Sequence, residues 1–119
     1  MTKDQSSKTF DLEERTLKFA KRVREFVKKL PKTIANIEDG KQLVRASGSV
    51  GANYIEANES VSKKDFVLRI KISRKEAKES KYWLELIDVN ADQEMGRGEI
   101  IQEATELLMI FSSIMRKSE

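Results

Sequence analysis

The sequence has no cysteine and no histidine, one proline, five glycines and eight aromatic residues among 119. Without cysteine, disulfides and thiol chemistry are excluded, and without histidine the chain lacks the commonest metal ligand and general base. No apolar run approaches the roughly 20 residues that a membrane span needs. Residues 1–9 are polar and lack the apolar core of a signal peptide. We therefore expect a cytoplasmic protein.

Charged residues make up 36% of the chain, and the length suits one domain with a modest core. The formal net charge is +3, which is compatible with nucleic-acid binding without requiring it. Its distribution is uneven. Residues 18–32 hold seven basic side chains against one acid, residues 63–81 hold eight against three, and residues 85–106 hold seven acids against one arginine. Separate basic and acidic surfaces are expected.

Apolar side chains recur at helical spacing in four stretches, which predict helices over residues 11–30, 37–57, 63–89 and 99–115. Residues 1–9 are predicted to be a flexible arm, and Ser62 is expected to cap the third helix. A polar segment with two glycines, residues 90–98, is predicted to be a loop. Four amphipathic helices with short connections predict an all-α, antiparallel up-down four-helix bundle over residues 10–117.

The segment from Leu43 to Asn58 is apolar or small-residued on two faces, since Val44, Gly48, Gly51 and Ile55 form a second stripe beside the core stripe. Each glycine costs roughly 1 kcal/mol inside a helix, so we expect another helix to approach closely here. A loop at residues 47–51 is the alternative interpretation. The third helix would also expose an apolar strip formed by Ile72, Trp83 and Leu86. Both features predict a homo-oligomer.

Five polar residues of the second and third helices form a candidate structural network: Arg45, Asn53, Glu56, Glu76 and Glu79. Glu76 and Glu79 lie one turn apart, where an antiparallel second helix could present Arg45 or Asn53 to them. We interpret the set as a network that fixes helix register. A metal centre is the more specific alternative. Di-iron sites in helix bundles also require Glu-x-x-His motifs, however, and the chain has no histidine.

No residue is assigned a catalytic role. The serines have no evident base to activate them, and Gly48 and Gly51 lack the lysine and the loop of a phosphate-cradling motif. An acid–base pair of Glu76 and Glu79 is conceivable, yet such carboxylate pairs are common in structural networks. We expect no enzymatic activity, no metal and no cofactor.

The basic side chains suggest a candidate nucleic-acid-binding surface, which comprises Lys71, Arg74, Lys78 and Lys81 with Lys21, Lys28 and Lys29. The alternative is an ordinary solvated surface that keeps a protein-interaction scaffold soluble, with an unknown protein partner. Phosphate contacts would give salt-dependent affinity. Aromatic residues do not interleave these cations, apart from Tyr82 nearby. Contact with the RNA or DNA backbone is therefore favoured over base recognition.

A family resemblance rests on two runs of residues. They are Leu43, Arg45, Ala46, Ser49, Val50, Asn53, Ile55 and Glu56, then Ser62 to Phe66, Lys75 to Ala77, Glu79, Ser80, Trp83 and Leu84. From Phe10 to about Met115 the chain resembles the four-helix-bundle proteins encoded in intervening sequences of bacterial 23S ribosomal RNA genes. One departure is Asn58, where the family usually has glycine; asparagine also tolerates left-handed turn geometry.

The resemblance implies a four-helix bundle that assembles into a ring, typically a homopentamer. Such proteins are also similar to the accessory protein of diversity-generating retroelements, a ring with a basic nucleic-acid-binding surface. No catalytic activity is established for the family, and many members lie outside ribosomal RNA genes.

Overall fold

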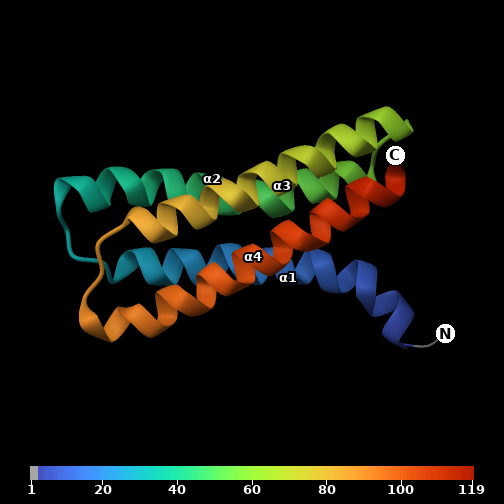
Figure 1. The fold of residues 1–119 in the computed structure, drawn as a ribbon. Coiled ribbons are helices and arrows are strands. Elements are labelled where there is room, and N and C mark those ends of the chain that lie inside the picture. Colours follow the sequence, from blue (N-terminus) through green and yellow to red (C-terminus); the bar gives the residue numbers. More distant parts are fainter. Residues whose placement is uncertain (1–2) are drawn as a thin grey trace.

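The computed structural model describes residues 3–119, with side chains from Leu12 onward, and shows four helices with short connections (Figure 1). The elements are α1 (Lys3–Lys28), α2 (Ile34–Asn58), α3 (Lys63–Leu86), the short 3-10 helix η1 (Ala91–Gln93) and α4 (Glu94–Ser118). Successive helices run in opposite directions, and no described residue lies in a strand. The predicted all-α four-helix fold is confirmed.

Helix boundaries differ from the prediction most at two places, the connection between α3 and α4 and the start of α1. The predicted loop over residues 90–98 is wrong beyond Gln93, because α4 begins at Glu94 and contains both glycines. Arg97 explains this early start: its Nη1 donates to the Ile87 carbonyl at 2.7 Å, and its Nη2 donates to the Glu94 carboxylate. The first turn of α4 is thus tied to the end of α3, where a cation also favours the helix dipole.

Apart from the starts of α1 and α4, the boundaries lie within three residues of the expectation. Ser62 caps α3 as predicted, since its hydroxyl accepts from the Asp65 amide at 3.0 Å. Helix α3 ends at Leu86, three residues before the predicted end. The predicted start of the first helix at residue 11 is wrong, because α1 begins at Lys3. Residues 1–2, and the side chains of residues 3–11, lie outside the described part, so the flexibility predicted for residues 1–9 stays a prediction.

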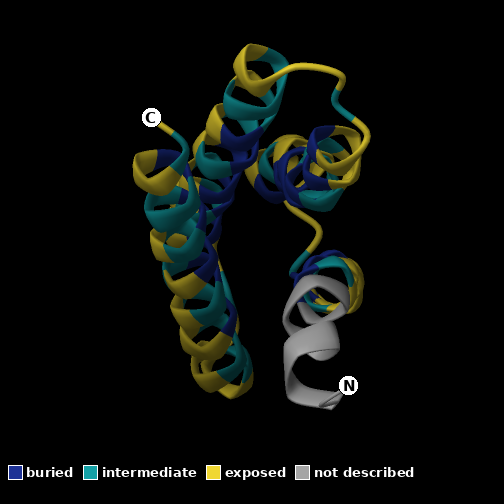
Figure 2. Ribbon diagram, turned by 90° about the vertical axis from the view of Figure 1, so that its right-hand side faces the viewer, coloured by how far each residue is buried: buried dark blue, intermediate teal, exposed yellow. Residues whose placement is uncertain are grey.

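The core is one apolar cluster to which all four long helices contribute, and the buried stretches of the ribbon face inward (Figure 2). Its fully buried large side chains include Phe19, Leu43, Ile70, Leu84 and Phe111. Every buried side-chain nitrogen or oxygen among the described residues has a hydrogen-bond partner. These side chains follow the helical spacing that predicted them, which is why sequence pattern and fold agree so closely here.

Helix α2 is continuous through residues 47–51, so the loop alternative is wrong. A Cβ atom placed on Gly51 would lie 2.8 Å from Thr16 Oγ1 and 3.1 Å from Thr16 Cβ, which confirms that another helix, α1, approaches closely. At Gly48 the nearest atom is Arg24 Nη2, at 3.7 Å, the end of a flexible side chain. The close approach of α1 and α2 therefore depends on Gly51.

The Asn36 side chain links the α1–α2 connection to the α3–α4 connection, at the end of the bundle where both lie. Its side chain is buried, and Nδ2 donates to the carbonyls of Pro31 and Asp88, each at 2.9 Å. Its Oδ1 accepts from the Asp88 amide at 3.0 Å. One side chain thus joins the start of α2 to the segment that follows α3.

Ion pairs cross from α1 to α4. Arg15 donates to Glu103 at 2.7 and 2.9 Å and to Glu106 at 2.7 Å, and Arg22 lies 3.2 Å from Glu99. Hydrogen bonds from Gln102 and Arg15 hold the pKa of the Glu106 carboxyl below its ordinary value. The bond from Arg15 to Glu103 raises the pKa of the guanidinium despite its partial burial. We call these pairs the α1–α4 seam.

None of the helices in the described part of the chain has the length and the apolar character that a membrane-spanning helix needs.

Candidate nucleic-acid interface

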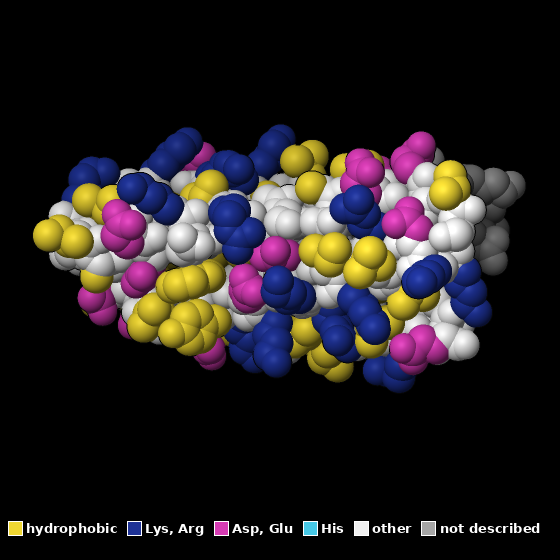
Figure 3. All heavy atoms as spheres, turned by 90° about the horizontal axis from the view of Figure 1, so that it is seen from above, with side chains coloured by type: hydrophobic (Ala, Val, Ile, Leu, Met, Phe, Trp, Pro, Cys, Tyr) yellow, Lys and Arg dark blue, Asp and Glu magenta, His cyan; other side chains and the backbone are white. Residues whose placement is uncertain are grey.

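A cationic groove runs between α3 and α4. It has a volume of about 690 Å³, and the residues that line it are Arg74, Lys75 and Lys78 of α3 with Leu108, Met109, Ser112 and Arg116 of α4. Among the side chains that the structure describes, no carboxylate lines it. Figure 3 shows Lys and Arg side chains gathered along the edge of the upper face that α3 forms. Because Leu108, Ser112 and Arg116 are four residues apart, one side of α4 supplies the opposite wall.

The groove brings together two of the predicted binding residues, Arg74 and Lys78. Lys71 lines a neighbouring hollow of about 600 Å³ at the end of the same two helices, together with Lys63, Lys64 and the C-terminal Glu119. Lys81 is half-buried and lines neither hollow. The predicted stripe on α3 is therefore divided between two hollows.

The predicted lysines of α1 lie elsewhere. Lys21 and Lys29 line a third hollow, of about 450 Å³, that α1 shares with the start of α4 and that also contains Glu25. Lys28 pairs with Glu25 at 2.9 Å. These three lysines do not line the cationic groove.

Sequence reasoning missed Lys75 and Arg116 as groove residues. Lys75 lies 3.9 Å from Glu79 in an i, i+4 pair, which gives it an ordinary role on the helix surface. Arg116 has a sufficient local explanation as a cation at a helix C-terminus. The available signal was the cationic run on α3 together with the antiparallel order of α3 and α4, which sets Arg116 near the first half of α3.

Arg45 holds two acids of α3. Its Nη1 and Nη2 each lie 3.5 Å from a Glu76 carboxylate oxygen, and Nη2 lies 3.4 Å from Glu79 Oε1. The Glu76 side chain is 8% exposed whereas that of Arg45 is 54% exposed. A buried carboxylate is costly unless it is paired, and the Arg45 guanidinium is the cation that lies nearest to the Glu76 carboxylate across the α2–α3 contact.

Asn53 and Glu56 do not join Arg45. Asn53 Oδ1 accepts from Arg69 at 3.1 Å, and its Nδ2 donates to the carbonyl and hydroxyl of Ser49. Glu56 is exposed, and its backbone carbonyl accepts from Ser60. The five predicted network residues thus belong to two clusters, one around Arg45 and one around Asn53, with Glu56 outside both. The Arg69 contact was missed because periodicity alone does not identify cross-helix partners.

The carboxylates are not arranged as a metal centre in the described part of the chain. No group of three or more histidine, cysteine, aspartate or glutamate residues there could hold a metal ion. Glu76 and Glu79 share the Arg45 guanidinium. This geometry suits a structural ion pair, and the acid–base interpretation of the two carboxylates gains no support from it.

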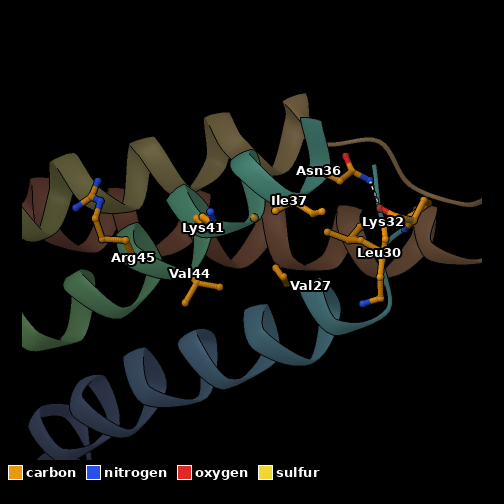
Figure 4. Close-up of a pocket in the computed structure, with 10 residues that line it drawn as sticks. Val27, Leu30, Lys32, Asn36, Ile37, Lys41, Val44 and Arg45 are labelled. Carbon is orange, nitrogen blue, oxygen red and sulfur yellow. Dashed lines mark hydrogen bonds between the residues drawn. The ribbon is translucent and has the colours of Figure 1, made fainter. Parts of the chain in front are cut away.

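An apolar groove lies on a different side of the molecule, between α1 and α2 (Figure 4). Its volume is about 590 Å³, and its apolar wall consists of Val27, Leu30, Pro31, Ile37, Gly40 and Val44. Val27 and Val44 point into the space between the two helices. Lys32, Asn36, Lys41 and Arg45 complete the lining. We call this the α1–α2 groove.

Fold and site together define a small antiparallel four-helix-bundle protein with a cationic groove between α3 and α4 and an apolar groove between α1 and α2. The model of the 23S rRNA-intervening sequence protein family matches residues 8–113, and the chain therefore belongs to that family. It is also similar to a crystal structure from Bacteroides thetaiotaomicron described as a protein of unknown function from the S23 ribosomal protein family. The two chains are 30% identical, with a TM-score of 0.73 and coverage of 87% of this chain and 96% of that one. No curated protein matches.

Proposed function

We propose that this protein is a non-enzymatic, homo-oligomeric accessory factor of the cytoplasm that binds the sugar–phosphate backbone of RNA or DNA. The single observation that carries the proposal is the cationic groove, where Arg74, Lys75, Lys78 and Arg116 converge from two helices and none of the described lining residues is an acid. Each phosphate that such a groove neutralises releases counterions and adds affinity.

The chemistry of the groove favours backbone contact over base recognition. Arginine presents a planar fork that matches phosphate oxygens, and the Ser112 hydroxyl can donate as well. Leu108 and Met109 provide apolar surface between the cations, and the described lining residues include no aromatic ring on which a base could stack. The groove would therefore bind strands with little regard to sequence.

Assembly is the second part of the proposal, and apolar exposure supports it. Ile37, Ile55, Tyr82 and Leu86 are each about half exposed on α2 and α3. Tyr82 and Leu86 are four residues apart and so lie on one side of α3, and an exposed apolar patch on a small protein marks an interaction site. Since the resemblance implies a homopentamer, we propose a ring of five copies. A ring would repeat the cationic groove, so weak individual contacts would act together.

Charge reversal within the groove tests the binding proposal. We expect the triple variant Arg74→Glu, Lys78→Glu, Arg116→Glu to lose affinity for nucleic acid and to show a shallower salt dependence. On duplex DNA the slope of log affinity against log salt should fall by about 0.9 for each phosphate contact removed. Fluorescence anisotropy would measure both quantities with structured 23S ribosomal RNA fragments, duplex DNA and single strands.

A matched control carries the same change of charge on α1: Lys21→Glu, Lys28→Glu, Lys29→Glu. If the groove is the binding site, this control should bind nucleic acid with an affinity close to that of the parent. If the attraction is diffuse, both variants should lose affinity equally. If the parent binds no nucleic acid at low salt, or if the groove variant binds as the parent does, the proposal is wrong.

A protein-interaction scaffold is the second candidate function. The α1–α2 groove favours it, because an apolar hollow is a common site for a protein segment. A scaffold would show no salt-dependent binding of nucleic acid, and affinity capture with the assembled protein would then be the next experiment.

A further inference from the structure

Tyr82 lies on α3 in line with the cations of the cationic groove. It follows Lys75 by seven residues and Lys78 by four, and positions so spaced share one side of a helix. From Lys78 to Tyr82 the distance along the helix axis is about 6 Å, at 1.5 Å per residue. Figure 3 shows hydrophobic side chains beside Lys and Arg side chains on the α3 side of the upper face. The groove therefore ends next to an aromatic ring.

The Tyr82 ring is held in place and is open to solvent. Its centroid lies 5.1 Å from that of Trp83, and the two rings meet edge to face, an arrangement that aromatic pairs prefer. Tyr82 nevertheless remains 56% exposed. A ring that is already oriented loses little conformational freedom when it binds a partner. Tyr82 is thus suited to stack on a planar ligand.

The surface on the groove side of Tyr82 is cationic. Arg74 and Lys78 line the groove, and neither forms an ion pair with another described side chain. Their charges are therefore available to a ligand. A molecule that carries both negative charge and a flat apolar ring would meet both features at once.

Two acids lie close to Tyr82 in sequence, and they limit where a negative ligand can extend. Glu79 lies 3.4 Å from Arg45 Nη2 and 3.9 Å from Lys75 Nζ, so cations already match its charge. Glu85, three residues after Tyr82, is exposed and would repel a phosphate placed beyond the ring. A strand would therefore reach Tyr82 from the groove and end there.

We propose that Tyr82 is a base-stacking residue at the end of the cationic groove, and that the ligand of this surface is a single strand of nucleic acid. This inference rests on the nucleic-acid binding proposed above and specifies the form of the ligand. The bases of a duplex are stacked on one another, whereas a single strand can turn a base out onto an aromatic side chain. Because every base has a π face, the stacking adds affinity without reading sequence.

Tyr82 also belongs to the exposed patch with Leu86 that supports assembly, so the test needs variants that separate the two roles. Tyr82→Leu keeps an apolar side chain at this position and removes the ring. Tyr82→Phe keeps the ring and is the matched control. A contact between copies would be satisfied by apolar surface, whereas a stacked base needs the aromatic face.

Strands without bases provide the direct test. Stacking of one base on an aromatic side chain changes affinity by roughly fivefold to 150-fold, so we expect the parent to bind a single strand at least several-fold more tightly than an abasic strand of the same length. Tyr82→Leu should bind both strands with the affinity that the parent has for the abasic one, and Tyr82→Phe should keep the parent's preference. Fluorescence anisotropy would measure the affinities, and light scattering should give all three proteins the same mass.

Trp83 offers a second readout, because it is the one tryptophan of the chain and its ring lies against that of Tyr82. A base stacked on Tyr82 should quench the Trp83 emission. We expect quenching by the base-bearing strand in the parent and in Tyr82→Phe, and none in Tyr82→Leu. The abasic strand, and a duplex of the same sequence, should leave the emission of all three proteins unchanged.

The outcomes distinguish the inference from the function on which it rests. If the parent binds base-bearing and abasic strands equally, or if Tyr82→Leu keeps the parent's preference, the stacking inference is wrong while backbone binding stands. If Tyr82→Leu changes the mass of the assembly, Tyr82 is a contact between copies, and the inference is wrong as well. A parent that binds no strand at low salt would overturn the proposed function and the inference with it.

Discussion

Gly48 and Gly51 lie one helical turn apart on α2, yet their surroundings predict opposite responses to the same substitution. A Cβ on Gly51 would lie 2.8 Å from Thr16 Oγ1, which is too close. A Cβ on Gly48 would lie 3.7 Å from Arg24 Nη2, which is an ordinary van der Waals distance. Alanine stabilises a helix by roughly 0.5–1 kcal/mol relative to glycine, while overpacking costs about 1–3 kcal/mol. We expect Gly48→Ala to raise the free energy of unfolding by up to about 1 kcal/mol and Gly51→Ala to lower it by about 1–2 kcal/mol.

Urea unfolding monitored by circular dichroism would measure both glycine variants under the same conditions. A stabilised Gly51→Ala variant would mean that α1, with Thr16, can move away from α2 at no cost in stability. The close approach of α1 and α2 would then not depend on the missing side chain.

Arg45 is the second residue whose removal has a definite expected cost. Arg45→Met would leave the buried Glu76 carboxylate without its guanidinium, and an unpaired buried acceptor costs about 1–3 kcal/mol. We expect the free energy of unfolding to fall by an amount in that range, toward its lower end because the Arg45 side chain is 54% exposed. Thermal unfolding would measure it, and Glu76→Gln in the same background should recover part of the loss. Equal stability of Arg45→Met and the parent would contradict the network.

Some site residues follow from sequence and others do not, for a physical reason. Glu76 and Glu79 lie one turn apart on α3, so an arginine on the antiparallel neighbour could be expected to meet both. Asn53 was grouped with the same acids, yet it meets Arg69. Its partner depends on how far α2 is shifted along α3, and that shift is set by the packing of the whole core.

At the scale of elements, Asn36 is the residue that ties two connections together. Asn36→Ala would remove three hydrogen bonds to Pro31 and Asp88. At a net 0.5–1.5 kcal/mol for each bond, we expect the free energy of unfolding to fall by about 2–3 kcal/mol. Chemical unfolding would measure this loss. Gln42→Ala is the control: Gln42 is an exposed amide on the same helix, and its loss should cost under about 0.5 kcal/mol. Equal effects would refute the role of Asn36.

The helices themselves could be predicted from apolar periodicity, but the end of α3 and the start of α4 could not. Gly96 and Gly98 favour a loop by their local propensity. The contact that outweighs this propensity joins Arg97 to Ile87, ten residues earlier, and depends on the two helices already lying side by side. Local pattern finds segments that bury a stripe; it does not find boundaries fixed by a tertiary hydrogen bond.

At the scale of the whole molecule, the two parts of the proposed function together predict how affinity depends on the length of the nucleic acid. An assembled ring presents several cationic grooves, so a strand long enough to reach two grooves should bind at least tenfold more tightly than a short one. Ile37→Lys, which introduces a charge into the exposed apolar surface of α2, should abolish this dependence on length while leaving the affinity for short strands unchanged. Anisotropy titrations with strands of increasing length would measure it. A variant that keeps the parent's length dependence would show that one copy forms the complete binding site.

The α1–α4 seam has a consequence for the motions of the native bundle. Over the described residues, α1 meets α4 through fewer contacts than α3 does, and exposed ion pairs such as Arg22–Glu99 hold helices together weakly. Proteins open in cooperative units, and the units with the fewest buried contacts open at the lowest free energy. Helix α1 should therefore detach before α2 and α3 separate. In native-state hydrogen exchange, the amides of residues 12–28 should exchange together, at a lower opening free energy than those of α3.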